Sequence, residues 1–114
     1  MKVHKNMIYV ASPYYDPDPS VIESRMEVVY EVMAGLMKEG NPCISPLLMH
    51  PVVKKHDLPN TFDYWENYSY DMLKRCDEML VIQLPGWEES RGVKAERDYC
   101  NLHNVPIDYL RVLR

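Results

Sequence analysis

The chain has 114 residues, of which 46% are hydrophobic and 26% charged, and these proportions are typical of one globular domain spanning residues 1–114. The formal net charge of −4 and the absence of a basic run argue against a nucleic-acid partner and against a membrane-surface partner. The sequence holds no apolar stretch near the ~18 residues of a membrane-spanning helix, and its first residues lack the apolar core of a secretory signal.

The N-terminal part of the chain predicts a strand followed by a long helix. Residues 7–11 form a short apolar run rich in β-forming residues, which predicts a buried strand that ends in a proline-rich loop. Residues 20–39 carry apolar side chains at spacings of three and four, which places them on one stripe of an amphipathic helix. Ser20 with Glu23 forms a capping-box pattern at its start, and Gly40 stands where a left-handed C-terminal cap belongs.

The rest of the chain continues the alternation of strands and helices. Residues 43–45 predict a short strand between two prolines, and residues 47–60, with further prolines and polar side chains, predict a loop. Two helices and two strands then alternate over residues 61–76, 79–84, 90–103 and 105–110. Pro106 predicts an edge position for the last strand, because proline cannot donate to a sheet hydrogen bond.

This order of elements predicts an α/β fold. Strands joined by helices need crossover connections, so we expect a three-layer, Rossmann-like or flavodoxin-like domain with a four-stranded, mostly parallel sheet. Ligands of such sheets bind beyond the carboxyl ends of the strands. The loops beginning at Ser12, Ser45 and Pro85 are therefore the expected walls of a binding site.

A carboxylate lies on the inward stripe of the last helix. Val93, Cys100 and His103 define that stripe by their spacing, and Glu96 falls on it. One interpretation places Glu96 at the rim of the helix or in an ion pair with a base such as Arg91. The other places it in the cleft at the strand ends, where a carboxylate is able to attack the anomeric carbon of a sugar.

The segment before this helix has the composition of an anion-binding loop. Gly86 and Gly92 allow a close approach of the backbone to a ligand, and Ser90 is expected to cap the helix. Free amides at a helix N-terminus bind anions without a basic patch. An ordinary glycine-containing turn before a capped helix explains the same residues and stays open.

Three stretches carry a resemblance to a known family. They are Tyr9-Val10-Ala11-Ser12-Pro13-Tyr14, Ser45-Pro46 with His50, and Arg75-Cys76-Asp77 leading to residues 84–96. Together they resemble short bacterial and phage domains related to nucleoside 2-deoxyribosyltransferases and deoxynucleoside monophosphate N-glycosidases. The likeness covers nearly the whole chain, and its most specific part is the Ser-x-Gly-Val-x-x-Glu segment that ends at Glu96.

The resemblance implies an enzyme that cleaves or exchanges the N-glycosidic bond of a nucleoside or nucleoside 5′-monophosphate. It implies that Glu96 is the nucleophile of a glycosyl-enzyme intermediate and that Tyr9 orients this glutamate. Ser90 and Gly92 resemble positions that hold a 5′-phosphate, and Ser12 lies in a loop that also contacts the phosphate. The family usually has an aspartate eight residues before the position of Asp77.

In this chain that position is Ser69, so Asp71 is the candidate acid for the leaving group. Two residues rotate a helical side chain by roughly 200°, so Asp71 serves only if the helix register differs. This departure keeps a second function open, a non-catalytic sensor module that binds a nucleotide or an ADP-ribose-like ligand. The expected substrate-binding residues are Ser12, Pro13, Tyr14, His50, Gly86, Trp87, Ser90 and Gly92.

The remaining polar and aromatic residues suggest neither a metal nor a cofactor. His50 and His56 match no zinc spacing, and the three cysteines lack a Cys-x-x-Cys pattern, so we expect reduced thiols and a cytoplasmic protein. Aromatic side chains between residues 64 and 70 fit core packing or a subunit contact better than base stacking. We therefore expect a homo-oligomer, with this helix as a candidate contact.

Overall fold

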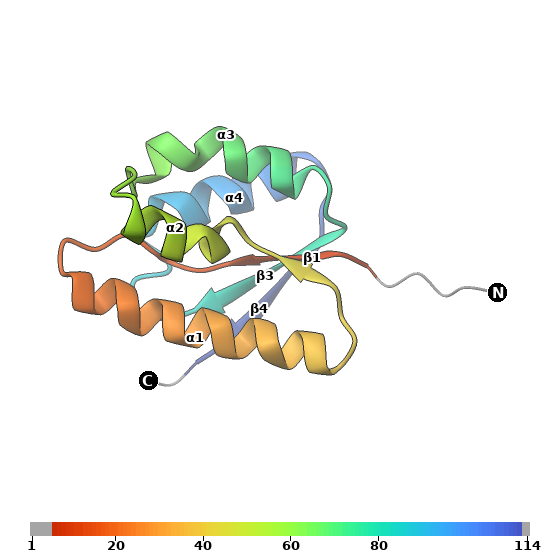
Figure 1. The fold of residues 1–114 in the computed structure, drawn as a ribbon. Coiled ribbons are helices and arrows are strands. Elements are labelled where there is room, and N and C mark those ends of the chain that lie inside the picture. The colour runs from red at the N-terminus through yellow and green to blue at the C-terminus, as the bar shows by residue number, and fades with distance from the viewer. Residues whose placement is uncertain (1–5, 113–114) are drawn as a thin grey trace.

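In a computed structural model, residues 6–112 fold into strands that alternate with helices (Figure 1). Residues 1–5 and 113–114, which include the segment considered for a secretory signal, lie outside the described residues. The elements are β1 (Ile8–Ala11), α1 (Pro19–Lys38), β2 (Cys43–Ile44), the 3₁₀ turn η1 (Pro46–Met49), α2 (His50–Lys55), α3 (Phe62–Leu73), β3 (Glu78–Gln83), α4 (Arg91–Leu102) and β4 (Ile107–Arg111).

The four strands form one sheet in the order β2-β1-β3-β4, and every pair is parallel. The predicted α/β fold with a Rossmann-like or flavodoxin-like topology is confirmed. The last strand lies at an edge, as Pro106 predicts.

Helices cover both faces of the sheet, with α1 on one side and α3 and α4 on the other (Figure 1). Alternate side chains of β1 point to opposite faces, as expected for a strand. Val10 packs in the core beneath α1 together with Met26. Tyr9 packs in the second core, which contains Leu73 of α3 and Val93 of α4. Among residues 6–112, no helix is both long and apolar enough to cross a membrane.

Side-chain caps fix where the two main helices begin. Ser90 caps α4, because its hydroxyl accepts a hydrogen bond from the Val93 amide at 3.3 Å. For α1 the predicted cap at Ser20 is wrong. The carboxylate of Asp18 accepts from the Ser20 amide at 2.9 Å, which lets Pro19 occupy the first helical position. Gly40, with φ of 80°, provides the expected left-handed ending.

Two further expectations are corrected. Residues 47–60 are not all loop, since most of η1 and all of α2 lie within them. Pro46 of η1 and Pro51 of α2 occupy early helical positions, where an amide hydrogen is not needed. The Ser45 hydroxyl caps η1 by accepting from the Leu47 amide at 3.2 Å. His103 is exposed rather than inward, because α4 ends at Leu102 and the inward stripe stops at Cys100.

Candidate active site

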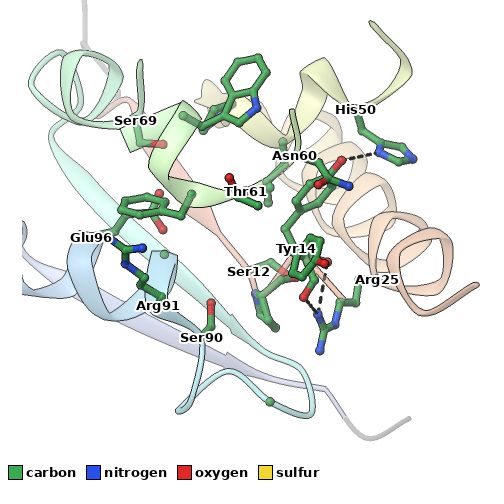
Figure 2. Close-up of a pocket in the computed structure, with 18 of the residues that line it drawn as sticks. Ser12, Tyr14, Arg25, His50, Asn60, Thr61, Ser69, Ser90, Arg91 and Glu96 are labelled. Atoms are coloured by element: carbon green, nitrogen blue, oxygen red, sulfur yellow. Dashed lines mark hydrogen bonds between the residues drawn. The ribbon is translucent and has the colours of Figure 1, made fainter. Parts of the chain in front are cut away.

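A cavity of about 540 Å³ opens where β1 and β3 end, between α2, the start of α3 and the start of α4. This volume is in the range of small-molecule sites, and its place is that of ligand sites in open parallel sheets. Figure 2 shows Glu96 and Arg91 on one side of the cavity and His50 on the other. The lining includes most of the expected site residues, namely Ser12, Pro13, Tyr14, His50, Gly86, Ser90, Gly92 and Glu96.

Glu96 is the buried carboxylate of this cavity. Its side chain is 7% exposed, whereas the lining residues Asp63 and Glu89 are exposed. The hydroxyl of Tyr9, itself fully buried in β1, donates a hydrogen bond to Oε2 of Glu96. Tyr9 is not part of the lining, so it reaches the site through Glu96.

Burial controls the ionisation of both groups. Desolvation raises the pKa of Glu96 to about 7, although the hydrogen bond from Tyr9 acts in the opposite direction. The pKa of Tyr9 is raised well above its ordinary value, first by burial and then by the charge of Glu96. Near neutral pH, Glu96 therefore exists in both protonation states while Tyr9 keeps its proton.

Ser69 completes this buried group. It lies on α3, is 2% exposed, and lines the cavity. A side-chain hydrogen bond between Ser69 and Tyr9 partly offsets the rise in the pKa of Tyr9. Ser69 thus helps to fix the phenol that contacts Glu96.

Asp71, the expected leaving-group acid, lies elsewhere. It is exposed and does not line the cavity. The helix register explains this result, because Ser69 faces inward and two residues turn the next side chain by roughly 200°. The structure therefore does not bring Asp71 to the site.

The two glycines near the start of α4 allow contacts within the protein. A Cβ atom on Gly86, whose φ is +92°, would lie 3.1 Å from the guanidinium of Arg25. A Cβ atom on Gly92 would lie 3.0 Å from the ring of Phe62. Both glycines line the cavity, and each also has a packing reason to lack a side chain.

Trp87 is not part of the cavity lining. Its ring lies 5.3 Å from the guanidinium carbon of Arg97 and 5.8 Å from the ring of Tyr109. These contacts direct the indole toward α4 and β4, away from the position that its loop suggests. The expectation that Trp87 binds the ligand is therefore not supported by its position.

On the opposite wall, His50 joins two neighbouring elements. Its Nδ1 atom lies 2.8 Å from the Tyr14 hydroxyl, and its Nε2 atom lies 2.9 Å from Oε1 of Glu23 (Figure 2 shows the first contact). Lys54 donates to the same glutamate oxygen at 2.9 Å. His56 is exposed. Within residues 6–112, no three His, Cys, Asp or Glu side chains are grouped closely enough to bind a metal ion.

Arg25, which no sequence pattern indicates as a site residue, connects the loops around the cavity. Its guanidinium donates to the carbonyls of Tyr14 at 3.2 Å, Tyr15 at 2.9 Å and Pro85 at 3.4 Å. Arg25 also lines the cavity. These partners lie up to 60 residues away in the chain, so no local pattern reveals them.

An ion pair joins two exposed residues of the cavity lining. Arg91 of α4 and Asp63 of α3 lie 2.5 Å apart, and both are largely exposed. Arg91 therefore pairs with Asp63 rather than with Glu96. Nearby on α3, Trp65 lines the cavity, whereas Tyr64 and Tyr68 are exposed on the surface.

Residues 6–110 match the family model described as "Domain of unknown function (DUF1937)". The chain belongs to the DUF1937 family. The matched residues include the complete lining of the cavity, so this site is part of the family domain and not of an appended segment. A comparison with curated proteins gives no match.

Proposed function

We propose that this DUF1937 domain cleaves or exchanges the N-glycosidic bond of a nucleoside or nucleoside 5′-monophosphate, through a glycosyl-enzyme intermediate on Glu96. One observation carries the proposal: a buried carboxylate, oriented by a buried tyrosine, forms part of the wall of a cavity of nucleoside size. The resemblance of residues 84–96 to nucleoside 2-deoxyribosyltransferases supports the same assignment.

The chemistry requires an ionised Glu96 and a leaving group that accepts a proton. Tyr9 binds Oε2, so Oε1 is the oxygen that attacks C1′ of the sugar while the bond from C1′ to the base nitrogen breaks. The base leaves with the bonding electron pair. Water or a second base then attacks C1′, the ester bond to Glu96 breaks, and the configuration at C1′ is retained.

The other walls of the cavity suit the rest of such a substrate. Ser90 and the amides at the start of α4 lie beside the cavity and suit a phosphate, and Arg91 adds a positive charge beside them. Aromatic rings of Phe62 and Trp65 offer faces for a base. No cofactor enters this mechanism.

The proposal extends to self-association through the exposed Tyr64 and Tyr68 side chains of α3. Sedimentation of the double variant Tyr64→Ser, Tyr68→Ser against the unmodified chain tests it. We expect dissociation of a homo-oligomer, and an unmodified chain that is already monomeric contradicts this part.

The direct test is release of free base from a panel of nucleosides and their 5′-monophosphates. We expect Glu96→Ala to abolish release, because the attacking atom is gone. Asp98→Asn is the matched control, since Asp98 lies on the same helix but is exposed and pairs with Lys94 at 2.9 Å. Release that survives in Glu96→Ala rejects the nucleophile.

A non-catalytic nucleotide sensor is the second candidate. Ser69 stands where the resembled family has an aspartate, and Asp71 does not reach the cavity, which favours binding without turnover. Calorimetry with the same panel separates the two functions. Tight binding of a nucleotide without any release of base by the unmodified protein identifies the sensor.

A further inference from the structure

Tyr14 and His50 face two neighbouring spaces. They are among the five residues, with Tyr15, Val53 and Asn60, that line both the 540 Å³ cavity that contains Glu96 and a second hollow of about 400 Å³. This hollow is rich in charged groups, with Asp16, Glu23 and Lys54 among its lining residues. A buried histidine with a polar partner on each ring nitrogen therefore faces both the candidate active site and an outer, charged space.

The hydrogen bonds of Tyr14 and His50 define which atoms carry protons. Glu23 accepts from both Lys54 and His50, and these bonds hold the pKa of its carboxyl below the usual range. Since Glu23 is a carboxylate, Nε2 of His50 must carry a hydrogen. Nδ1 then either accepts from the Tyr14 hydroxyl, when the ring is neutral, or donates to the Tyr14 oxygen, when the ring is an imidazolium.

The two states present different groups to the cavity that contains Glu96. With a neutral ring, the Tyr14 hydrogen points to His50 and its oxygen is free to accept. With an imidazolium, the Tyr14 oxygen accepts from His50 and its own hydrogen is free to be donated into the cavity. Burial, followed by the charge of Glu23, raises the pKa of Tyr14, so the phenol passes a proton on rather than persisting as a phenolate.

We propose that Tyr14 is the general acid that protonates the departing base, and that His50 and Glu23 are positioning residues that replace its proton from Nδ1 of His50 and take it back afterwards. This inference rests on the proposed glycosidic function. It assigns the acid that the exposed Asp71 does not provide. His50 and Glu96 lie on opposite sides of the cavity, as Figure 2 shows, so a substrate between them meets the nucleophile and the acid from different sides.

The proton balance of the step closes within these groups. As Glu96 attacks C1′, the bond to the base nitrogen breaks, the base takes the electron pair, and the Tyr14 hydrogen moves to that nitrogen. The Nδ1 hydrogen of His50 moves to the Tyr14 oxygen, which leaves a neutral imidazole bonded to Glu23. When water attacks C1′ and frees Glu96, the water proton returns through the Tyr14 oxygen to Nδ1.

Several charged or titratable groups set the electrostatic surroundings of His50. They come from the loop after β1, from α1, from α2 and from the loop after α2, and they are Tyr14, Asp16, Glu23, Arg25, Tyr30, Lys54 and Asp57. Glu23 is the carboxylate in direct contact with the ring. Glu23 therefore fixes the hydrogen on Nε2 and leaves Nδ1 to face the Tyr14 hydroxyl.

The test compares two substrates that share a sugar and differ in the leaving group. An ordinary purine nucleoside needs a proton as the base departs, whereas its N7-methylated form already carries a positive charge and leaves as a neutral base. We expect Tyr14→Phe to lower kcat/KM for the ordinary substrate by about 10²–10⁴-fold, the usual range for a general acid, and to change the methylated substrate less than ~10-fold. Tyr109→Phe, which alters an exposed tyrosine of β4, is the matched control.

The outcomes separate this inference from the proposed function. Equal losses on both substrates overturn the acid role of Tyr14, while abolition of both reactions by Glu96→Ala leaves the glycosidic function intact. If the unmodified protein cleaves neither substrate of any such pair, the proposed function fails first.

The same pair of substrates tests the positioning residues independently of folding. We expect Glu23→Gln and His50→Ala each to lower kcat/KM for the ordinary substrate and to leave kcat/KM for the methylated substrate in place. A Glu23→Gln protein that cleaves the ordinary substrate as fast as the unmodified protein overturns the relay.

Discussion

Tyr9→Phe isolates the hydrogen bond that holds Glu96. The substitution keeps the buried ring in β1 and removes the hydroxyl that donates to Oε2 of Glu96. A hydrogen bond to a charged group contributes about 1.5–3 kcal/mol, and one pKa unit corresponds to about 1.4 kcal/mol. Loss of this bond therefore raises the pKa of Glu96 from about 7 by a further ~1–2 units, because the ionised form loses more than the neutral form.

This shift has a calculable effect on rate. The nucleophile is the ionised form, so activity is present above the pKa and lost as the pH falls through it. At pH 7 the ionised fraction falls from about one half to ~1–10%, which lowers the rate about 5–50-fold.

The assay is the pH dependence of kcat/KM for base release, with Tyr109→Phe as the matched control. A carbon-13 titration of the Glu96 carboxyl gives the same pKa without turnover. An acidic limb that stays in place in Tyr9→Phe, or a rate lowered equally at every pH, refutes the idea that Tyr9 tunes the charge of Glu96.

Three further predictions concern stability and recognition. Glu96→Gln should stabilise the fold at pH 8 by up to about 3 kcal/mol and have little effect below pH 4.5. The raised pKa of Glu96 favours folding below about pH 4.5, and this contribution is lost as the pH rises through about 7. Equal shifts of the urea midpoint at the two pH values contradict this prediction. Gly92→Ala should destabilise the fold by about 1–3 kcal/mol, because the new methyl group meets the Phe62 ring. Gly35→Ala, with open space around it, should stabilise α1 by ~0.5–1 kcal/mol. Changes in melting temperature of the same sign for the two variants refute the packing argument. Arg91→Gln should change stability by less than ~1 kcal/mol, because its ion pair with Asp63 is exposed. The substitution should weaken the binding of monophosphates more than that of nucleosides. Calorimetry that shows equal losses of affinity for the two kinds of ligand contradicts a phosphate role.

The strands and long helices were predictable because their signals are local. Period-two and period-3.6 apolar patterns do not depend on distant residues, and Glu96 stood out as a charge on the inward stripe of Val93 and Cys100. The short helix α2 was missed, because Pro51 indicates a break unless the position of a helix start is already known.

The rest of the site depends on contacts that form only in the folded chain. The hydrogen bonds of Arg25, and those of His50 with Tyr14 and Glu23, join residues that lie 10 to 60 positions apart in the chain. No sequence spacing encodes such neighbours. Trp87 was placed in the cavity by its loop, but its direction is set by Arg97 and Tyr109.

The glycosyl-enzyme is the species on which the central claim depends. Incubation with a 2′-fluorinated nucleoside, which slows breakdown of the intermediate, followed by mass spectrometry of the intact protein and of its peptides, detects it directly. We predict a mass increase equal to one sugar residue, located on Glu96 and absent from Glu96→Gln. Base release without any adduct, or an adduct on another residue, contradicts the account.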